Sequence, residues 1–356
     1  MPTVRGDAIM ARNLVLCLDG TAGQVRGDAD SNCVRVYDLL DLSDETAQVA
    51  YYDPGVGTFA SPGAWTPLAR GLSRLGGLIY GAGMRQNLGE AYAWLMRTWQ
   101  PGDRIFVFGF SRGAFTARAL TGMLRLVGLM RPGSENQLQY AVAKYARRGG
   151  EGRIPWDEIH RFSRLFAQQV DGRSTIPIEY LGLWDTVKAL GVVRIAPDWP
   201  YTRQLPNARH IRHAISIDER RRPFREYEVR TKAPETLEEA WFAGIHSDVG
   251  GTYADDPKLS TIALKWVLEG AVDRGLKLDA KRTAKEFEGF SDAHSAGAAH
   301  RNGAVWSLLV PRRRPIPPGV RVHASVRERM SATDYRPRLP ADATWVDDDW
   351  TTLRIP

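Results

Sequence analysis

The sequence contains little cysteine and no long apolar run. Its two cysteines, Cys17 and Cys33, do not form a C-x-x-C pair, which argues against a disulfide framework and a structural zinc site. The first residues lack the apolar core of a signal peptide, and no uninterrupted apolar run is long enough to cross a bilayer. We therefore expect a chain that is soluble and cytoplasmic as synthesised, so that any export would follow a signal-free route.

Motifs that bind common cofactors are also missing. The sequence has no P-loop, no G-x-G-x-x-G opening a helix after the first strand, and no H-E-x-x-H. We expect neither an organic cofactor nor a metal. The formal net charge is +7, but no dense run of Lys and Arg with interleaved aromatics occurs, which argues against a nucleic-acid partner. The positive balance instead favours peripheral contact with an anionic membrane.

The composition is that of an ordinary globular protein, with 43% hydrophobic and 25% charged residues in a chain of 356. Apolar runs alternate with helical patterns, which predicts an α/β fold with a mostly parallel sheet and helices on both faces. We expect a single catalytic domain over residues 1–356, with a core at about 13–329 and a polar C-terminal tail at 330–356.

The strongest signal is the stretch from Arg104 to Arg118, RIFVFGFSRGAFTAR. An apolar, β-prone run precedes an intact G-x-S-x-G, and a helical pattern follows it from Ala114 to Val127. A strand, a tight turn with serine at its apex and a helix form a nucleophile elbow. The pattern therefore predicts that Ser111 is a nucleophile; the alternative is a serine without chemistry in a glycine-rich turn.

Partners for this serine follow later strands. Asp185 ends the predicted strand 177–183, and His246 ends the predicted strand 239–245, before a Gly-Gly loop. The order Ser111, Asp185, His246 is that of α/β-hydrolases. Asp218 competes for the acid role, although it looks paired with the arginines at 220–222. His323 is the runner-up base.

Two backbone N–H groups are expected to bind the oxyanion of the reaction. The Arg112 N–H lies at the start of the helix after the serine. The first predicted strand, Asn13–Leu18, ends in a loop at the edge of the sheet where ligands bind, so Gly20 or Thr21 is the candidate for the second donor. Asp19 would orient this loop; a simple Asp-Gly turn is the alternative.

Two segments are candidates for covering the site. Residues 59–83 are apolar and glycine-rich, and would form either a lid that touches lipid or buried loop and helix. Residues 132–172 look helical and lie after the elbow, where lipases often carry a cap, so they form a candidate cap insertion.

Six motifs together resemble one family in their order along residues 13–329. The family is domain of unknown function 2235, which includes the catalytic domain of type VI secretion phospholipase effectors. The resemblance implies an α/β-hydrolase fold, a serine esterase acting on phospholipid acyl esters, and signal-free type VI secretion. It also maps the family's nucleophile, acid and base onto Ser111, Asp185 and His246. The motifs are LCLDGT (16–21), YYDPGVGT (51–58), FGFSRGAFTAR (108–118), GLWDTV (182–187), SIDERR (216–221) and WFAGIHSDVGG (241–251).

The sequence thus predicts a serine hydrolase that cleaves carboxylic esters, with lipids as substrates, through a Ser-His-Asp acyl-enzyme mechanism. Three alternatives remain. The chain would be a soluble carboxylesterase or thioesterase, or a non-catalytic binding module on the same fold. The third is a metal site built from Asp19, Asp185 and Asp248.

Overall fold

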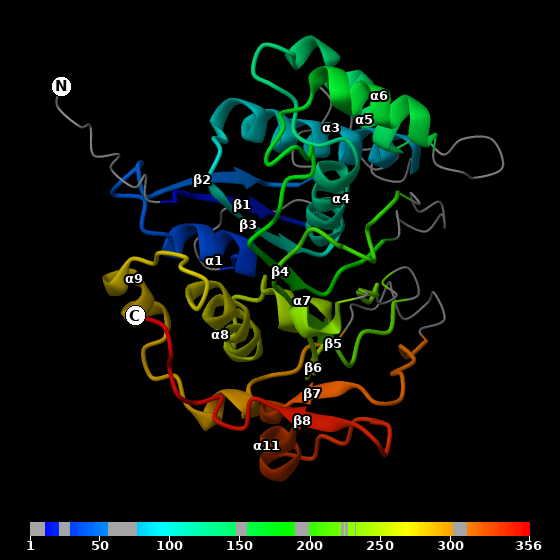
Figure 1. Cartoon of the computed structure of the whole chain (residues 1–356). Helices are drawn as coiled ribbons and strands as arrows, with labels where there is room; N and C mark the ends of the chain where they lie inside the picture. The colour runs from blue at the N-terminus through cyan, green and yellow to red at the C-terminus, as the bar shows by residue number, and fades with distance from the viewer. Residues whose placement is uncertain are drawn as a thin grey trace, which may run out of the picture.

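Eight strands form one sheet in the computed structural model, which describes residues 11–20, 29–55, 77–146, 155–188, 199–221, 224, 227–231, 233–301 and 312–356. The strand order is β2-β1-β3-β4-β5-β6-β7-β8, and every pair is parallel (Figure 1). The predicted α/β class is confirmed. The strands are β1 Asn13–Leu18, β2 Gln48–Asp53, β3 Arg104–Phe110, β4 Tyr180–Trp184, β5 Ile211–Ser216, β6 Leu237–Phe242, β7 Arg321–His323 and β8 Thr344–Val346.

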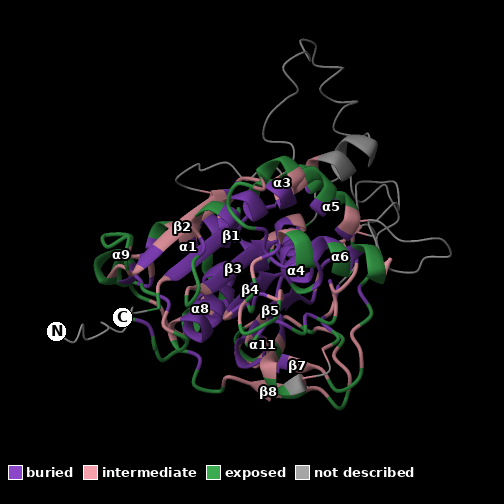
Figure 2. Cartoon of the chain, turned by 45° about the horizontal axis from the view of Figure 1, so that its top comes forward, coloured by how far each residue is buried: buried purple, intermediate pink, exposed green. Residues whose placement is uncertain are grey.

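Helices cover both faces of the sheet because successive strand residues point to opposite sides. In β1, Leu14, Leu16 and Leu18 pack in one core cluster, whereas Val15 and Cys17 pack in the other. The first face carries α3 Gly77–Thr98, α4 Arg112–Leu126, α5 Leu138–Ala146 and α6 Trp156–Phe166. The second carries α1 Asn32–Leu39, α8 Lys258–Val272 and α9 Ala280–Glu286. Figure 2 shows buried residues along the strands and on the helix faces that meet them.

The C-terminal part of the chain differs from the polar tail expected at 330–356. β8 pairs with β7 at the edge of the sheet, next to α11 Ala324–Ala332. Trp350 and Ile355 are buried against the second face. Strands of three residues are too short to show a hydrophobic period, which explains why the sequence pattern missed them. The sequence pattern at 306–310 favours a final strand or a short hairpin, but these residues lie outside the described part of the chain.

The two candidate covering segments are described unequally. Most of the 59–83 segment lies outside the described residues, and its end, from Gly77 on, belongs to α3. In the 132–172 segment, α5 and α6 bury Ala141, Ile159 and Phe162 against the first face. Its role as a cap stays a prediction. No helix in the described part of the chain has the length and apolar character needed to span a membrane.

Candidate active site

Ser111 lies at the sharp turn between β3 and α4, with φ 59° and ψ −121°. A non-glycine residue seldom adopts such a backbone conformation, and one that persists must be held by its surroundings. The flanking glycines make the turn sterically feasible. A Cβ on Gly109 would lie 2.6 Å from the Cα of Ala114, and one on Gly113 would lie 2.0 Å from the carbonyl oxygen of Leu18. The local geometry is that of a strand-turn-helix elbow.

Backbone hydrogen bonds fix this elbow to the end of β4. The Ser111 N–H donates to the Trp184 carbonyl at 3.0 Å, and the Val187 N–H donates to the Ser111 carbonyl at 3.3 Å. Asp185, between these partners, has φ 40°, and its N–H donates to the Ala214 carbonyl at 2.7 Å. The serine and the aspartate therefore meet at the carboxyl edge of the sheet, where ligands bind in open α/β folds.

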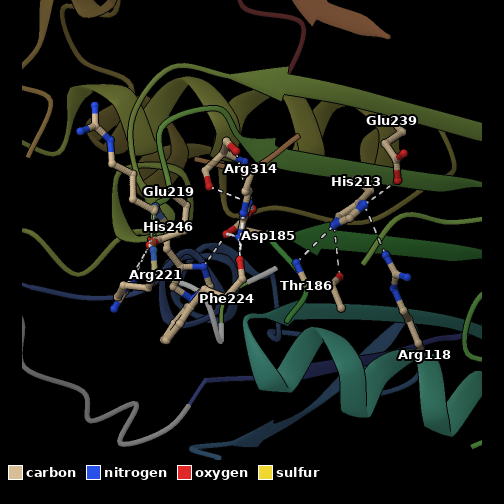
Figure 3. Close-up of polar contacts among 12 residues, drawn as sticks. Arg118, Asp185, Thr186, His213, Glu219, Arg221, Phe224, Glu239, His246 and Arg314 are labelled. Atoms are coloured by element: carbon tan, nitrogen blue, oxygen red, sulfur yellow. Dashed lines mark hydrogen bonds and ion pairs between the residues drawn. The ribbon is translucent and has the colours of Figure 1, made fainter. Parts of the chain in front are cut away.

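His246 reaches the same place from the end of β6. Its Nδ1 lies 2.5 Å from Oδ2 of Asp185, and only 4% of the residue is exposed (Figure 3). The imidazole packs between Phe110, at a centroid distance of 4.7 Å, and Phe224, at 4.9 Å. Phe110 directly precedes Ser111, so the histidine ring contacts the elbow strand.

The Gly-Gly loop expected after His246 is in fact a short helix, α7 His246–Gly250. Gly244 turns the chain out of β6 with φ 101°, and Oδ2 of Asp248 accepts the Ile245 N–H at 2.9 Å. This contact caps the start of α7. The histidine is therefore the first residue of a capped helix, held between two aromatic rings.

Asp185 is held by four hydrogen-bond donors although it is 1% exposed. Besides His246, they are the Ser216 N–H at 2.9 Å and two guanidinium nitrogens of Arg314 at 2.5 and 2.9 Å. Burial alone would raise the pKa of Asp185, but the Arg314 charge and the hydrogen bond from His246 outweigh it, and the pKa lies far below its ordinary value. Asp185 is therefore ionised.

Burial lowers the pKa of His246, whereas its hydrogen bond with the Asp185 carboxylate and the charge of that group act in the opposite direction. The net pKa lies below the ordinary value for histidine, so the imidazole is neutral at pH 7. The charges of Glu219 and Arg221 also affect the pKa of His246. Glu219 accepts a hydrogen bond from the backbone N–H of His246 at 3.3 Å and forms an ion pair with Arg221 at 2.8 Å. A neutral imidazole fixed by an ionised carboxylate is suited to accept a proton.

Two of the three oxyanion candidates, Arg112 and Gly20, belong to the part of the chain that the structure describes. Arg112 is the first residue of α4, so its backbone N–H lies at the N-terminus of that helix. Gly20 lies close to the serine, because a Cβ added to it would be 3.2 Å from the Cβ of Ser111. However, its N–H donates to Oδ1 of Asp19 at 2.6 Å. Thr21 lies outside the described residues. Asp19 also accepts from Ser31 at 2.5 Å, and so ties this loop to α1.

The other candidate residues have separate surroundings. His323, the runner-up base, is buried against Phe242, at a centroid distance of 4.5 Å, and bonds to Asp347 at 3.2 Å. Asp218 was expected to pair with the arginines at 220–222; among the described residues it accepts from the Gly244 N–H and the Tyr335 hydroxyl, while Glu219 takes the contact with Arg221.

The three aspartates of the metal alternative also have different partners. Asp19 binds Ser31, Asp185 binds His246, and Asp248 binds His300. Within the described ranges, no group of three or more His, Cys, Asp or Glu residues could hold a metal ion. The geometry therefore gives no support to a carboxylate metal site.

Three features in and around the site have no sequence signal. Arg314 belongs to a Pro- and Arg-rich stretch, and Phe224 follows a basic run. The third feature is a buried group around His213, which the sequence analysis did not predict. Nδ1 of His213 lies 2.7 Å from Oε2 of Glu239, and Nε2 accepts the Thr186 backbone N–H at 3.3 Å (Figure 3). Each contact joins residues far apart in the sequence, and no local period reveals such pairs.

The sheet and the elbow define an α/β protein with a serine, a histidine and an aspartate gathered at one sheet edge. The comparison with known families goes further. Residues 12–270 match the model of the catalytic domain of Tle1-like phospholipase effectors of the type VI secretion system, and the chain belongs to this family.

Individual relatives are more distant. The uncharacterized protein YEL023C of Saccharomyces cerevisiae is 32% identical over 224 residues, which cover 60% of this chain and 32% of that protein. The chain thus spans about a third of its length. A crystal structure of an uncharacterized protein from Pseudomonas aeruginosa has 20% identity and a TM-score of 0.43, covering 78% of this chain and 48% of that one. The Tle1 effector bound to the VgrG spike has 20% identity and a TM-score of 0.37, covering 68% and 52%.

Proposed function

We propose that this chain is a serine hydrolase that cleaves carboxylic esters, with the acyl esters of phospholipids or related lipids as substrates. The observation that carries the proposal is the 2.5 Å contact between His246 and Asp185 beside a strained serine elbow. Membership of the phospholipase effector family supports lipid as the substrate. The net charge of +7 supports peripheral contact with an anionic membrane.

In the proposed mechanism, His246 takes the proton from the Ser111 hydroxyl, and the serine oxygen attacks the ester carbonyl. Asp185 holds the imidazole through Nδ1 and stabilises its protonated form. The N–H of Arg112 donates to the oxyanion, and a second N–H comes from Gly20 or Thr21. The Gly20 N–H would have to leave Asp19 to do so, which favours Thr21. Protonated His246 then releases the alcohol, and water hydrolyses the acyl-enzyme.

Delivery belongs to the same proposal. The resemblance described above implies type VI secretion, which requires no signal peptide. The matching family is also named for effectors of the type VI secretion system. Secretion of this chain is therefore proposed together with lipid hydrolysis.

The test is hydrolysis of phosphatidylglycerol and phosphatidylethanolamine vesicles, beside a short p-nitrophenyl ester. Wild type is compared with Ser111→Ala and with the exposed control Ser331→Ala. We expect fatty acid release that is lost in Ser111→Ala and kept in the control. Serine-dependent cleavage of the short ester alone would refute the lipid substrate and favour a soluble carboxylesterase. Equal rates for wild type and Ser111→Ala would refute the serine mechanism.

A further inference from the structure

Arg314 is a buried arginine beside the proposed catalytic acid, and the hydrolase mechanism above does not use it. Its side chain is 3% exposed. Nη1 lies 2.5 Å from Oδ1 of Asp185, and Nη2 lies 2.9 Å from Oδ2. Nη1 also donates to the Ser216 hydroxyl at 2.8 Å, and Nε donates to the Phe224 carbonyl at 2.9 Å. A guanidinium is so costly to bury that such a site needs compensating contacts.

We propose that Arg314 is a positioning residue of the active site, which holds the Asp185 carboxylate and the Phe224 backbone so that His246 is oriented toward Ser111. The proposal rests on the proposed function, because the orientation matters only if His246 is the base. It also extends the site to a residue outside the part that matches the family, residues 12–270.

The first part of the argument is the shape of the contact. A guanidinium presents parallel N–H groups in one plane, which match the two oxygens of a carboxylate. Because Arg314 occupies both oxygens of Asp185, the carboxylate cannot rotate without breaking one of these bonds. The same Oδ2 that accepts from Nη2 lies 2.5 Å from Nδ1 of His246. The arginine therefore fixes the direction of the bond that orients the imidazole.

The second part is the aromatic cover of the histidine. Arg314 donates to the carbonyl of Phe224, whose ring meets the His246 ring at 80° with a centroid distance of 4.9 Å. Two residues before Arg314, the Arg312 N–H donates to the Arg220 carbonyl at 2.9 Å. The segment at 312–314 is thus bonded to the loop that carries Phe224, and one side chain links both supports of the imidazole (Figure 3).

The third part is charge. His246 faces the carboxylates of Asp185 and Glu219 and the guanidinium of Arg221, and Arg314 lies on the far side of Asp185. Behind the Asp185 turn, the charged groups beside buried His213 are Glu239 and Arg118. Arg314 is the cation bonded directly to the acid, and its charge opposes proton binding by the Asp185–His246 pair. Its loss would make this pair bind a proton at higher pH.

The experiment compares Arg314→Gln, Arg314→Lys and the exposed neighbour Arg313→Gln as matched control. The first readout is the pH profile of kcat on the p-nitrophenyl ester. We expect Arg314→Gln to lower kcat at least about tenfold and to move the acid limb up by about one pH unit or more. Arg314→Lys keeps the charge but loses the two-oxygen contact, so its kcat falls while its acid limb moves less. Arg313→Gln should match wild type.

The second readout is the titration of His246 by NMR, which needs no activity. An acid limb and an imidazole titration unchanged in Arg314→Gln would overturn the proposal, as would an equal loss of kcat in Arg313→Gln. If Arg314→Gln does not fold, Arg314→Lys decides, because wild-type kcat in that variant would exclude a role for the two-oxygen contact. If wild type and Ser111→Ala hydrolyse the ester equally, the proposed function fails, and the NMR titration still tests the coupling of Arg314 to His246.

Discussion

Replacing Asp185 with asparagine should affect activity and folding stability by different routes. Four donors converge on this carboxylate, from His246, the Ser216 N–H and Arg314. An asparagine side chain has one acceptor oxygen and one NH₂ group, so at least one of these donors would face another donor. The change preserves size but removes both the charge and half of the acceptor capacity.

The expected magnitudes follow from burial. In a Ser-His-Asp triad the change lowers kcat by about 10⁴, because the imidazole loses its orientation and tautomer. Arg314, with 3% of its side chain exposed, would also lose its counterion. Breaking a buried ion pair from one side costs about 3–5 kcal/mol, which is a large part of the roughly 5–15 kcal/mol that keeps a domain folded.

A second variant separates the two effects. Asp185→Asn combined with Arg314→Met removes both charges, so neither partner is left as a buried ion without its counterion. We expect the double variant to regain most of the lost stability, measured by urea unfolding, while hydrolysis of the p-nitrophenyl ester stays near the level of Asp185→Asn. A single variant with kcat within tenfold of wild type, or one as stable as wild type, would refute this reasoning.

Three further predictions concern pH, the elbow and the alternative base. Burial lowers the pKa of His246, and the neutral imidazole is the proposed base. Activity should therefore fall only as pH drops below about 6.5, the ordinary pKa of histidine. An acid limb of kcat/KM centred above pH 7 would contradict this. Gly113→Ala would place a Cβ 2.0 Å from the Leu18 carbonyl oxygen, so it should abolish activity and destabilise the fold by more than about 1 kcal/mol. The control is Gly89→Ala, whose Cβ would meet only ordinary van der Waals contacts; it should be neutral or stabilising in thermal melts. His323→Gln removes the ring that stacks on Phe242 and should lower the melting temperature, but kcat should stay within a few-fold of wild type; a loss of activity like that of His246→Gln would restore His323 as a candidate base.

The sequence pattern predicted the central part of the fold because that part consists of long apolar strands with clear boundaries. The strand at Asn13–Leu18 agrees with the prediction residue by residue, and the elbow lies between β3 and α4 as its motif indicates. Placing Ser111, Asp185 and His246 at strand ends was sufficient to bring them to one edge, since parallel strands share the direction of their carboxyl ends.

The remaining parts depend on tertiary contacts between distant segments. β7 and β8 are three residues long and form only where the neighbouring edge strand offers pairing. Arg314 lies in a stretch rich in proline, and nothing local distinguishes it from Arg313, which is exposed. Its burial follows from the position of Asp185, 129 residues earlier in the chain. Likewise, the helical conformation after His246 depends on the Asp248 cap and not on a helical period.

The most direct test of the central claim is the site of modification by a fluorophosphonate probe, determined by peptide mass spectrometry. A serine activated by His246 and Asp185 should be labelled at Ser111, and the label should fall to background in Ser111→Ala and decrease strongly in His246→Gln. Ser331 serves as an internal control, because an exposed serine without a base should stay unmodified. Labelling that is absent in wild type, or that persists at full extent without His246, would contradict the account.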